Sequence, residues 1–217
     1  MMRYHSVVFD LDGTLVDSSG DITAALNVAI GAVGGRRLRS EEVVPLLGEG
    51  SVRLVEEAIS IAAPTGPWNL HEVHDHYRAE YLAHPAELSS LYAGVPDALA
   101  ALDDGGVVMA VCTNKSQELA EIVLDRLGII DFFDGIVGND AVPRSKPDPA
   151  HVFACFHAIR QNPASGLYVG DSTIDEAAAT GAQVDFLAVD WAPREVKGAR
   201  LESYLHLPGL VLEPTRI

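Results

Sequence analysis

The chain has 217 residues, 48% of them hydrophobic and 21% charged, which is enough apolar material for one large core and a smaller second one. Acidic residues outnumber basic residues by 31 to 15, and the resulting net charge of -16 disfavours nucleic acid or an anionic membrane surface as a partner. The same excess of acid would repel a phosphorylated ligand. Any phosphate site therefore needs local cations, either lysine and arginine side chains or a metal ion.

Cysteine usage and the length of the apolar runs indicate where the protein works. Cys112 and Cys155 each lie in an apolar stretch and form no Cys-x-x-Cys pair, so two buried, reduced thiols are favoured over a disulfide bond. The first apolar run is too short for a signal peptide, and no run approaches the roughly 18 residues that a membrane span needs. We therefore expect a cytoplasmic protein with no membrane partner. Whether it is a monomer or a homodimer, the sequence does not determine.

Short, uniformly apolar runs alternate with helix-like segments along much of the chain. The runs cover residues 6–9, 107–112, 135–137, 166–169 and 185–189, and the clearest helical segments between them cover 116–127, 149–160 and 174–180. Strands that are apolar on both faces are typical of a parallel sheet covered by helices on both sides. The sequence therefore predicts an α/β fold with a doubly wound parallel-sheet core of the Rossmann-like kind.

The interval between the first two runs is too long for a single crossover, since about 95 residues separate them. Within it, helical spacing of apolar residues covers 21–32, 41–47, 51–62 and 69–83. We expect an inserted α-helical domain over residues 16–84, and a core domain formed by residues 1–15 and 85–217. The end of the chain gives only a weak helical signal.

Two carboxylates, Asp10 and Asp12, follow the first apolar run directly, and Gly13 comes next. Ligands of open α/β sheets bind at the carboxyl ends of the strands, so Asp10 stands where a site is expected. Gly13 permits a sharp turn that can aim Asp12 into the same cavity. Taken alone, these residues are also compatible with a plain strand end.

Three further segments that follow predicted strands carry polar groups. Thr113, Asn114 and Lys115 follow the second strand, Lys146 lies in the loop after the third, and residues 170–175, Gly-Asp-Ser-Thr-Ile-Asp, follow the fourth. Each group alone could be a helix cap or a solvated charge. Because the carboxyl ends of parallel strands meet at one edge of the sheet, together they predict a cluster of carboxylates, a lysine and a hydroxyl at that edge.

In order and spacing, these four segments resemble the four motifs of the haloacid dehalogenase-like hydrolase superfamily. The matching segments are 10–18 (Asp-Leu-Asp-Gly-Thr-Leu-Val-Asp-Ser), 113–115 (Thr-Asn-Lys), 146–149 (Lys-Pro-Asp-Pro) and 170–175. The resemblance spans nearly the whole chain, and members of this branch carry a helical cap domain at the position of the insert. It implies phosphoryl-group chemistry, because a carboxylate at the position of Asp12 separates the phosphatases from the dehalogenases of the superfamily.

The resemblance also implies catalytic roles for the motif residues. Asp10 would attack phosphorus and form an aspartyl-phosphate, and Asp12 would protonate the leaving group and later deprotonate water. Thr113, the backbone amide of Asn114 and Lys146 would bind the phosphoryl oxygens and stabilise the charge that spreads over them.

A Mg²⁺ ion would complete the site that the resemblance implies. Its ligands would be the carboxylate of Asp10, the backbone carbonyl of Asp12 and the carboxylate of Asp171, which are the hard oxygen donors that Mg²⁺ prefers. Asp175 would orient Lys146 or a water on the metal. The ion and the lysine would supply the local cations that the negative net charge makes necessary.

Within the superfamily, the inserted segment resembles that of the phosphoglycolate phosphatases. Residues 47–56, Leu-Gly-Glu-Gly-Ser-Val-Arg-Leu-Val-Glu, and the Thr-Asn-Lys motif carry the likeness, whereas residues 183–185 and 190–192 replace a stretch that is more glycine-rich in that family. Gly48 and Arg53 are the candidates for binding the substrate's leaving group, with Arg53 suited to a carboxylate. A solvated helix charge is the alternative for Arg53.

These observations predict a Mg²⁺-dependent phosphatase that hydrolyses a small phosphorylated metabolite, with 2-phosphoglycolate as the best candidate. Sugar phosphates, pyrophosphate and nucleotide monophosphates remain open as substrates. One alternative is a phosphosugar mutase of the same superfamily, which would return the phosphoryl group to a second sugar hydroxyl. Another is a phospho-accepting signalling module, which combines acids, threonine and lysine on a similar sheet but places its phosphoacceptor on a later strand.

Overall fold

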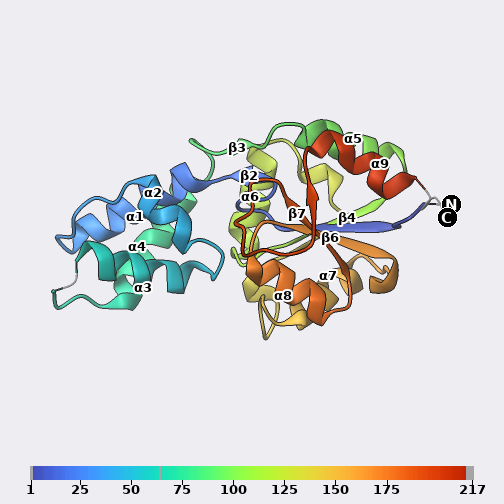
Figure 1. The fold of residues 1–217 in the computed structure, drawn as a ribbon. Helices are drawn as coiled ribbons and strands as arrows, with labels where there is room; N and C mark the ends of the chain where they lie inside the picture. Colours follow the sequence, from blue (N-terminus) through green and yellow to red (C-terminus); the bar gives the residue numbers. More distant parts are fainter. Residues whose placement is uncertain (1, 64, 214–217) are drawn as a thin grey trace. The chain divides into compact units, whose positions relative to one another are not determined.

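The computed structural model describes residues 2–63 and 65–213 and divides the chain into two compact units. One unit joins Met1–Val16 to Leu91–Ile217, and the other is Asp17–Ser90. Figure 1 shows the first as a sheet flanked by helices and the second as a group of helices. We call them the core unit and the helical unit.

The chain passes between the units in two short strands. These are β2 (Val16–Asp17) and β3 (Ser90–Leu91), which pair with each other in a two-stranded sheet. The helical unit therefore begins at residue 17 and ends at residue 90. The sequence analysis expects an inserted domain over residues 16–84.

A parallel sheet forms the centre of the core unit, as the sequence predicts, and its order is β5-β4-β1-β6-β7-β8. The strands are β1 (Ser6–Phe9), β4 (Val108–Cys112), β5 (Gly135–Val137), β6 (Gly166–Gly170), β7 (Asp185–Val189) and β8 (Ala199–Leu201). Five of them agree with the predicted runs to within one residue, and the edge strand β8 was not predicted. Since β1 lies between β4 and β6, the residues that follow these three strands emerge side by side.

Helices cover both faces of this sheet (Figure 1). On one face lie α5 (Val95–Asp104), α6 (Gln117–Arg126) and α9 (Leu207–Leu212), and on the other α7 (Pro149–Ala158) and α8 (Thr173–Gly181). Short 3-10 turns are η2 (Ile130–Phe132), η3 (Asn139–Ala141), η4 (Pro163–Ser165) and η5 (Tyr204–His206). Val7 and Phe9 of β1 pack with the α5 side and Val8 with the α7 side, which is why the strand is apolar throughout.

The helical unit is built from the four segments in which the sequence shows helical spacing. They form α1 (Ser19–Ala32), α2 (Ser40–Val43) with the 3-10 turn η1 (Val44–Leu46), α3 (Ser51–Ala62) and α4 (Leu70–Ala83). The buried carboxylate of Asp21 on α1 accepts hydrogen bonds from the backbone N–H groups of Glu87 and Leu88 and from the Ser89 hydroxyl. This contact fixes the segment after α4 against α1.

Both cysteines are free and buried, in agreement with the sequence analysis. His151 lies beside them, but its Nε2 is 3.0 Å from the Val137 carbonyl and its Nδ1 accepts from the Lys146 N–H at 3.2 Å. Both ring nitrogens are therefore used within the protein, as in an ordinary core histidine. Among the described residues, none of the helices has the length and apolar character that a membrane crossing requires.

Candidate active site

Asp10 emerges from the middle of the sheet. It follows β1 directly, its backbone N–H donates to the Val169 carbonyl of β6 at 2.9 Å, and its side chain is buried. β1 is fully buried and paired on both sides. The position of Asp10 is therefore set by the sheet rather than by a flexible loop.

Lys146 connects the polar groups of the site. Its ammonium group donates to Asp10 Oδ1 at 2.7 Å, to Asp175 Oδ1 at 2.7 Å and to the Tyr168 hydroxyl at 3.0 Å, so all three of its hydrogens are used. Burial disfavours the charged lysine, but the carboxylates of Asp10 and Asp175 outweigh this effect and raise the pKa of Lys146 above its ordinary value. Lys146 is therefore a fixed cation in contact with the predicted nucleophile.

Asp175 holds Lys146 from the first turn of α8. Its Oδ1 faces Lys146 and the Tyr168 hydroxyl, and its Oδ2 accepts from the backbone N–H and the hydroxyl of Ser172 at 3.1 and 2.5 Å. The Ser172–Asp175 pair is the capping box that begins the helix. Each carboxylate oxygen thus already faces two donors, which supports the orienting role that the resemblance implies.

Asp171 adds a further carboxylate next to Asp10. One oxygen from each of Asp10, Asp171 and Asp175 lies within 4.8 Å of the other two. Burial, followed by the charge of Asp175, raises the pKa of Asp10 well above its ordinary value and raises that of Asp171 to about 7. One lysine among three carboxylates leaves the cluster short of positive charge. The donor set therefore fits a hard divalent cation such as Mg²⁺, with Asp10 and Asp171 as its carboxylates.

Asp12 directs its carboxylate at Lys115. The lysine Nζ donates to both carboxylate oxygens, at 2.9 and 2.8 Å, and the Lys115 side chain is only 5% exposed. The sequence analysis gave Lys115 no role and did not anticipate this ion pair. Because the carboxylate is occupied, a metal ligand from Asp12 would be its backbone carbonyl, as the resemblance implies.

Thr113 and Asn114 follow β4 and are both buried. The Thr113 Oγ1 accepts from the backbone N–H of Lys115 at 3.1 Å, and the Asn114 side chain donates to the backbone carbonyl of Lys146 at 3.0 Å. The Asn114 side chain therefore ties the loop of Lys146 to the end of β4. The predicted contact of Asn114 with a phosphoryl group accordingly rests on its backbone amide.

The turn that follows β1 is held at several points by side chains distant in sequence. The Thr14 hydroxyl donates to Asp171 Oδ1 at 2.8 Å. The indole N–H of Trp191 donates to the Gly13 carbonyl at 2.7 Å, and the Tyr204 hydroxyl donates to the Thr14 carbonyl at 3.0 Å. These contacts fix the turn without using the carboxylate of Asp10 or that of Asp12.

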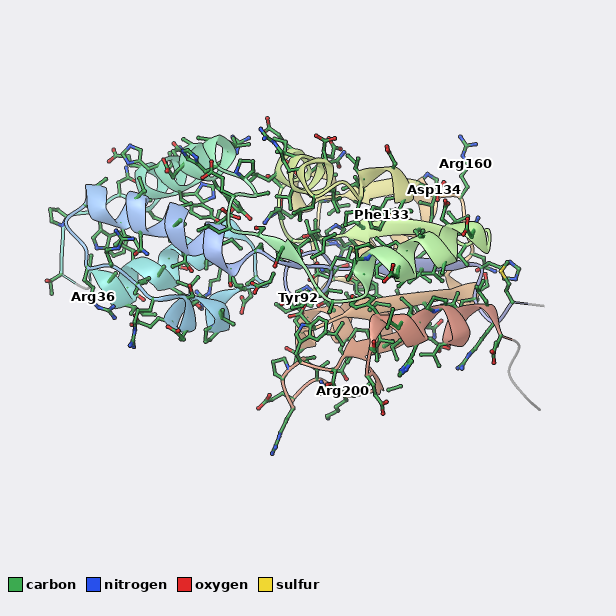
Figure 2. All side chains as sticks on the ribbon, turned by 90° about the horizontal axis from the view of Figure 1, so that it is seen from above. Arg36, Tyr92, Phe133, Asp134, Arg160 and Arg200 are labelled. Carbon is green, nitrogen blue, oxygen red and sulfur yellow. The ribbon has the colours of Figure 1, made fainter. Side chains whose placement is uncertain are left out.

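The loop that carries Trp191 is itself anchored. Tyr92 stacks on Trp191 with ring centroids 4.1 Å apart, and the Arg200 guanidinium donates to backbone carbonyls of residues 189, 190, 192, 193 and 196. Figure 2 labels both Tyr92 and Arg200 on the ribbon. Trp191 therefore reaches the Gly13 carbonyl from a rigid support.

Gly48 and Arg53, the predicted substrate-binding residues of the insert, belong to the helical unit. Gly48 has a φ of 107° in the turn before α3. Arg53 lies on α3 with its side chain 52% exposed, 3.1 Å from Glu56, 2.8 Å from Glu57 and 4.0 Å from Glu49. Its guanidinium is thus paired with neighbouring glutamates, and its contact with a substrate stays a prediction.

Lys115, Tyr168, Trp191 and Tyr204 are among the residues around the site that have no role in the sequence analysis. Tyr168 carries the one hydroxyl in its strand, and a buried hydroxyl needs a partner, so a signal was present. Lys115 ends the Thr-Asn-Lys motif, so its place in the sequence was also a signal that it belongs to the site. No sequence pattern connects Trp191 or Tyr204 to the turn after β1.

Comparison with known proteins places this geometry in a family. The chain matches the family described as haloacid dehalogenase-like hydrolase over residues 7–189. It is 39% identical over 181 residues to a phosphoglycolate phosphatase of Cereibacter sphaeroides, covering 83% of this chain and 82% of the relative. A phosphoglycolate phosphatase of Caulobacter vibrioides is 32% identical over 210 residues, covering 94% of this chain and 89% of the relative.

A solved structure agrees with these relatives. The crystal structure of a predicted phosphoglycolate phosphatase from Haemophilus somnus matches with a TM-score of 0.90 at 25% identity, and it covers 97% of this chain and 99% of that one. The matched region contains all four motif segments, and the relatives are phosphatases rather than dehalogenases or signalling modules. The chain therefore belongs to the haloacid dehalogenase-like hydrolase family, and it is a phosphatase.

Proposed function

We propose that the protein is a Mg²⁺-dependent phosphatase that hydrolyses a small phosphate monoester, 2-phosphoglycolate being the best candidate, through an aspartyl-phosphate on Asp10. One observation carries this proposal. The buried Asp10 carboxylate lies 2.7 Å from the fixed ammonium group of Lys146, beside Asp171 and at the carboxyl end of the central strand. A nucleophile, a cation for the phosphoryl oxygens and a metal-binding carboxylate thus share one place.

The reaction has two displacements at phosphorus. Asp10 attacks, a bond forms between its carboxylate oxygen and phosphorus, and the bond to the leaving oxygen breaks while Asp12 gives that oxygen a proton. A water molecule then attacks phosphorus, gives a proton to Asp12, and displaces the Asp10 carboxylate as inorganic phosphate forms. Lys146 binds the phosphoryl oxygens throughout, together with Thr113 and the amide of Asn114.

The carboxylates of Asp10 and Asp171 and the backbone carbonyl of Asp12 would hold Mg²⁺. When bound, the ion supplies positive charge that reduces the repulsion between carboxylate and phosphate.

The ion pair between Asp12 and Lys115 affects the first displacement. A proton on Asp12 removes the negative charge that Lys115 faces and makes the hydroxyl oxygen a poor acceptor. We therefore expect the ion pair with Lys115 to loosen when Asp12 acts as the acid.

The substrate class rests on the relatives and on the insert. Relatives at 31–39% identity are named phosphoglycolate phosphatases, and the excess of acidic residues means that local cations must hold a phosphorylated substrate. We propose that residues 16–84 act as a cap and that Gly48 and Arg53 contact the leaving group. The setting is the cytoplasm, with a small phosphorylated metabolite as the partner.

Arg53→Ala should lower kcat/KM for 2-phosphoglycolate more than for a neutral aryl phosphate, because only the former carries a carboxylate for the guanidinium to bind. Arg39→Ala is the matched control, since Arg39 also lies in the helical unit and pairs with a glutamate. Steady-state rates on both esters measure the effect. Unchanged relative rates in Arg53→Ala would make Arg53 a solvated helix charge and remove it from the site.

Gly13→Ala should disable the site through Asp171. Gly13 has a φ of 87°, and a Cβ added there would lie 2.5 Å from Asp171 Oδ2, so the carboxylate must move. We expect turnover to fall on the order of 100-fold. Gly128→Ala is the matched control, because it has a φ of 71° and no atom within 4 Å of an added Cβ. Equal turnover in the two variants would contradict the role of Asp171.

A phosphate-release screen tests the proposed function as a whole. Purified protein is incubated with Mg²⁺ and a panel of phosphorylated metabolites that includes 2-phosphoglycolate, sugar phosphates, pyrophosphate and nucleotide monophosphates. We expect inorganic phosphate from 2-phosphoglycolate at the highest kcat/KM. Conversion of a sugar phosphate into an isomer without release of phosphate would identify a mutase instead.

A further inference from the structure

Tyr168 occupies the interior of the core unit directly beneath the site. It lies on β6, two residues before the strand ends at Gly170, and its side chain is fully buried among residues of β1, β4, α7 and α8. Its ring packs near Phe186, with centroids 6.3 Å apart. An apolar side chain would fill this volume equally well, so the hydroxyl group calls for an explanation.

The hydroxyl faces three polar groups that belong to the site or adjoin it. Lys146 Nζ lies at 3.0 Å, Asp175 Oδ1 at 3.1 Å and the Cys112 carbonyl at 3.1 Å. An ammonium group can only donate hydrogen bonds, so the tyrosine oxygen accepts a hydrogen bond from Lys146. Its own hydrogen is donated to one of the two acceptors, the carbonyl or the carboxylate. The hydroxyl is therefore oriented from both sides.

We propose that Tyr168 is a positioning residue that, together with Asp175, fixes the Lys146 ammonium group so that its third hydrogen points at Asp10 and at the phosphoryl oxygens that arrive there. This inference rests on the proposed function. Asp175 and Tyr168 hold two of the three hydrogens, and both groups come from the β6–α8 segment. The lysine keeps its direction when Asp10 becomes phosphorylated and ceases to be a full carboxylate.

The chemistry of the acceptor supports this role. The cluster already contains three carboxylates, and another would repel the incoming phosphate. The neutral hydroxyl of Tyr168 holds one hydrogen of the ammonium group without adding negative charge. Burial and the nearby Asp175 raise the pKa of Tyr168 well above its ordinary value, so the hydroxyl stays neutral.

Tyr168→Phe tests the proposal because it removes one oxygen and keeps the ring. We expect kcat to fall by about 10- to 100-fold on alkyl and aryl phosphates alike, with KM little changed, since misplacing a positioned charge costs transition-state binding. Inhibition by orthovanadate, which adopts the trigonal-bipyramidal geometry of the transferring group, should weaken more than inhibition by inorganic phosphate. A merely structural hydroxyl would leave the ratio of the two inhibition constants unchanged.

Tyr4→Phe is the matched control. Tyr4 is a buried tyrosine of the same unit whose hydroxyl donates to Asp185 Oδ2 at 2.6 Å, and each variant removes one tyrosine hydroxyl and keeps the ring. We expect Tyr4→Phe to lower the melting temperature without altering kcat or the inhibition ratio. Wild-type kcat in a folded Tyr168→Phe protein, or equal kinetic losses in both variants, would overturn the proposal.

Two further arms separate the possible failures. Should Tyr168→Phe not fold, site-specific 3-fluorotyrosine keeps the ring and hydroxyl while weakening the oxygen as an acceptor. It should lower kcat at position 168 but not at position 4, and equal rates at both positions would overturn the proposal. If the wild-type protein releases no phosphate from any ester, the proposed function fails instead, and the role of Tyr168 fails with it.

Discussion

Asp12→Ala protein that is given an aryl phosphate should accumulate a phosphoryl group on Asp10. An aryl leaving group departs without a proton, so the first displacement proceeds, whereas the second needs Asp12 to accept a proton from water. With an alkyl phosphate, the first displacement should itself slow by about 10²–10⁴-fold, the usual contribution of a positioned acid. Intact mass after a rapid acid quench detects the adduct, and peptide mapping locates it.

Asp10→Asn is the partner experiment, because it removes the nucleophile and leaves Asp12 and Lys115 in place. No adduct and no turnover should occur with any ester. Lys115→Met checks that the loss in Asp12→Ala comes from proton transfer rather than from the broken ion pair, since it breaks the pair and keeps the Asp12 carboxylate. An adduct mapped to another residue, or equal losses for both leaving groups without an adduct, would show that the two roles are assigned wrongly.

The parts of the fold that could be predicted are those whose local pattern has one explanation. Residues 6–9 form a strand because they are buried on both faces, and the site residues could be anticipated because they follow such strands. The edge strand β8 could not be predicted, because its three residues do not form an apolar run. They include Arg200, whose side chain binds carbonyls of the preceding loop. Helix α5 is absent from the predicted helices, although its buried residues stand at helical spacing and its pattern is local.

The site shows the same division between short-range and long-range information. Asp10, Lys146 and Asp171 were found because each belongs to a motif, and a motif is local in sequence. The partners that orient them are not local. The Tyr168 hydroxyl meets the Cys112 carbonyl across 56 positions, and the Trp191 indole meets Gly13 across 178. Such contacts depend on strand order and loop path, which no single segment encodes.

Removal of divalent metal should abolish turnover, and Mg²⁺ should restore it. Without the metal, the carboxylates of Asp10 and Asp171 face the phosphate unscreened, and only Lys146 opposes them. Asp171→Asn should raise the Mg²⁺ concentration needed for half-maximal activity. Asp190→Asn, at an exposed carboxylate that follows β7, should not. Full activity in excess chelator would contradict the mechanism.

The melting temperature gives a test of the same metal site that does not depend on turnover. In metal-free protein the pKa of Asp171 is raised to about 7, chiefly by burial and then by Asp175, against about 3.9 in an unfolded chain. Between these values the folded protein holds a proton that the unfolded chain has lost, so this group makes the free energy of unfolding fall as pH rises. We expect the melting temperature of chelator-treated wild type, relative to Asp171→Asn, to fall from pH 5 to pH 7. Mg²⁺ takes the place of that proton, so the stabilisation by Mg²⁺ should increase from pH 5 to pH 7. It should be lost in Asp171→Asn. A stabilisation by Mg²⁺ that depends on neither pH nor Asp171 would place the metal elsewhere.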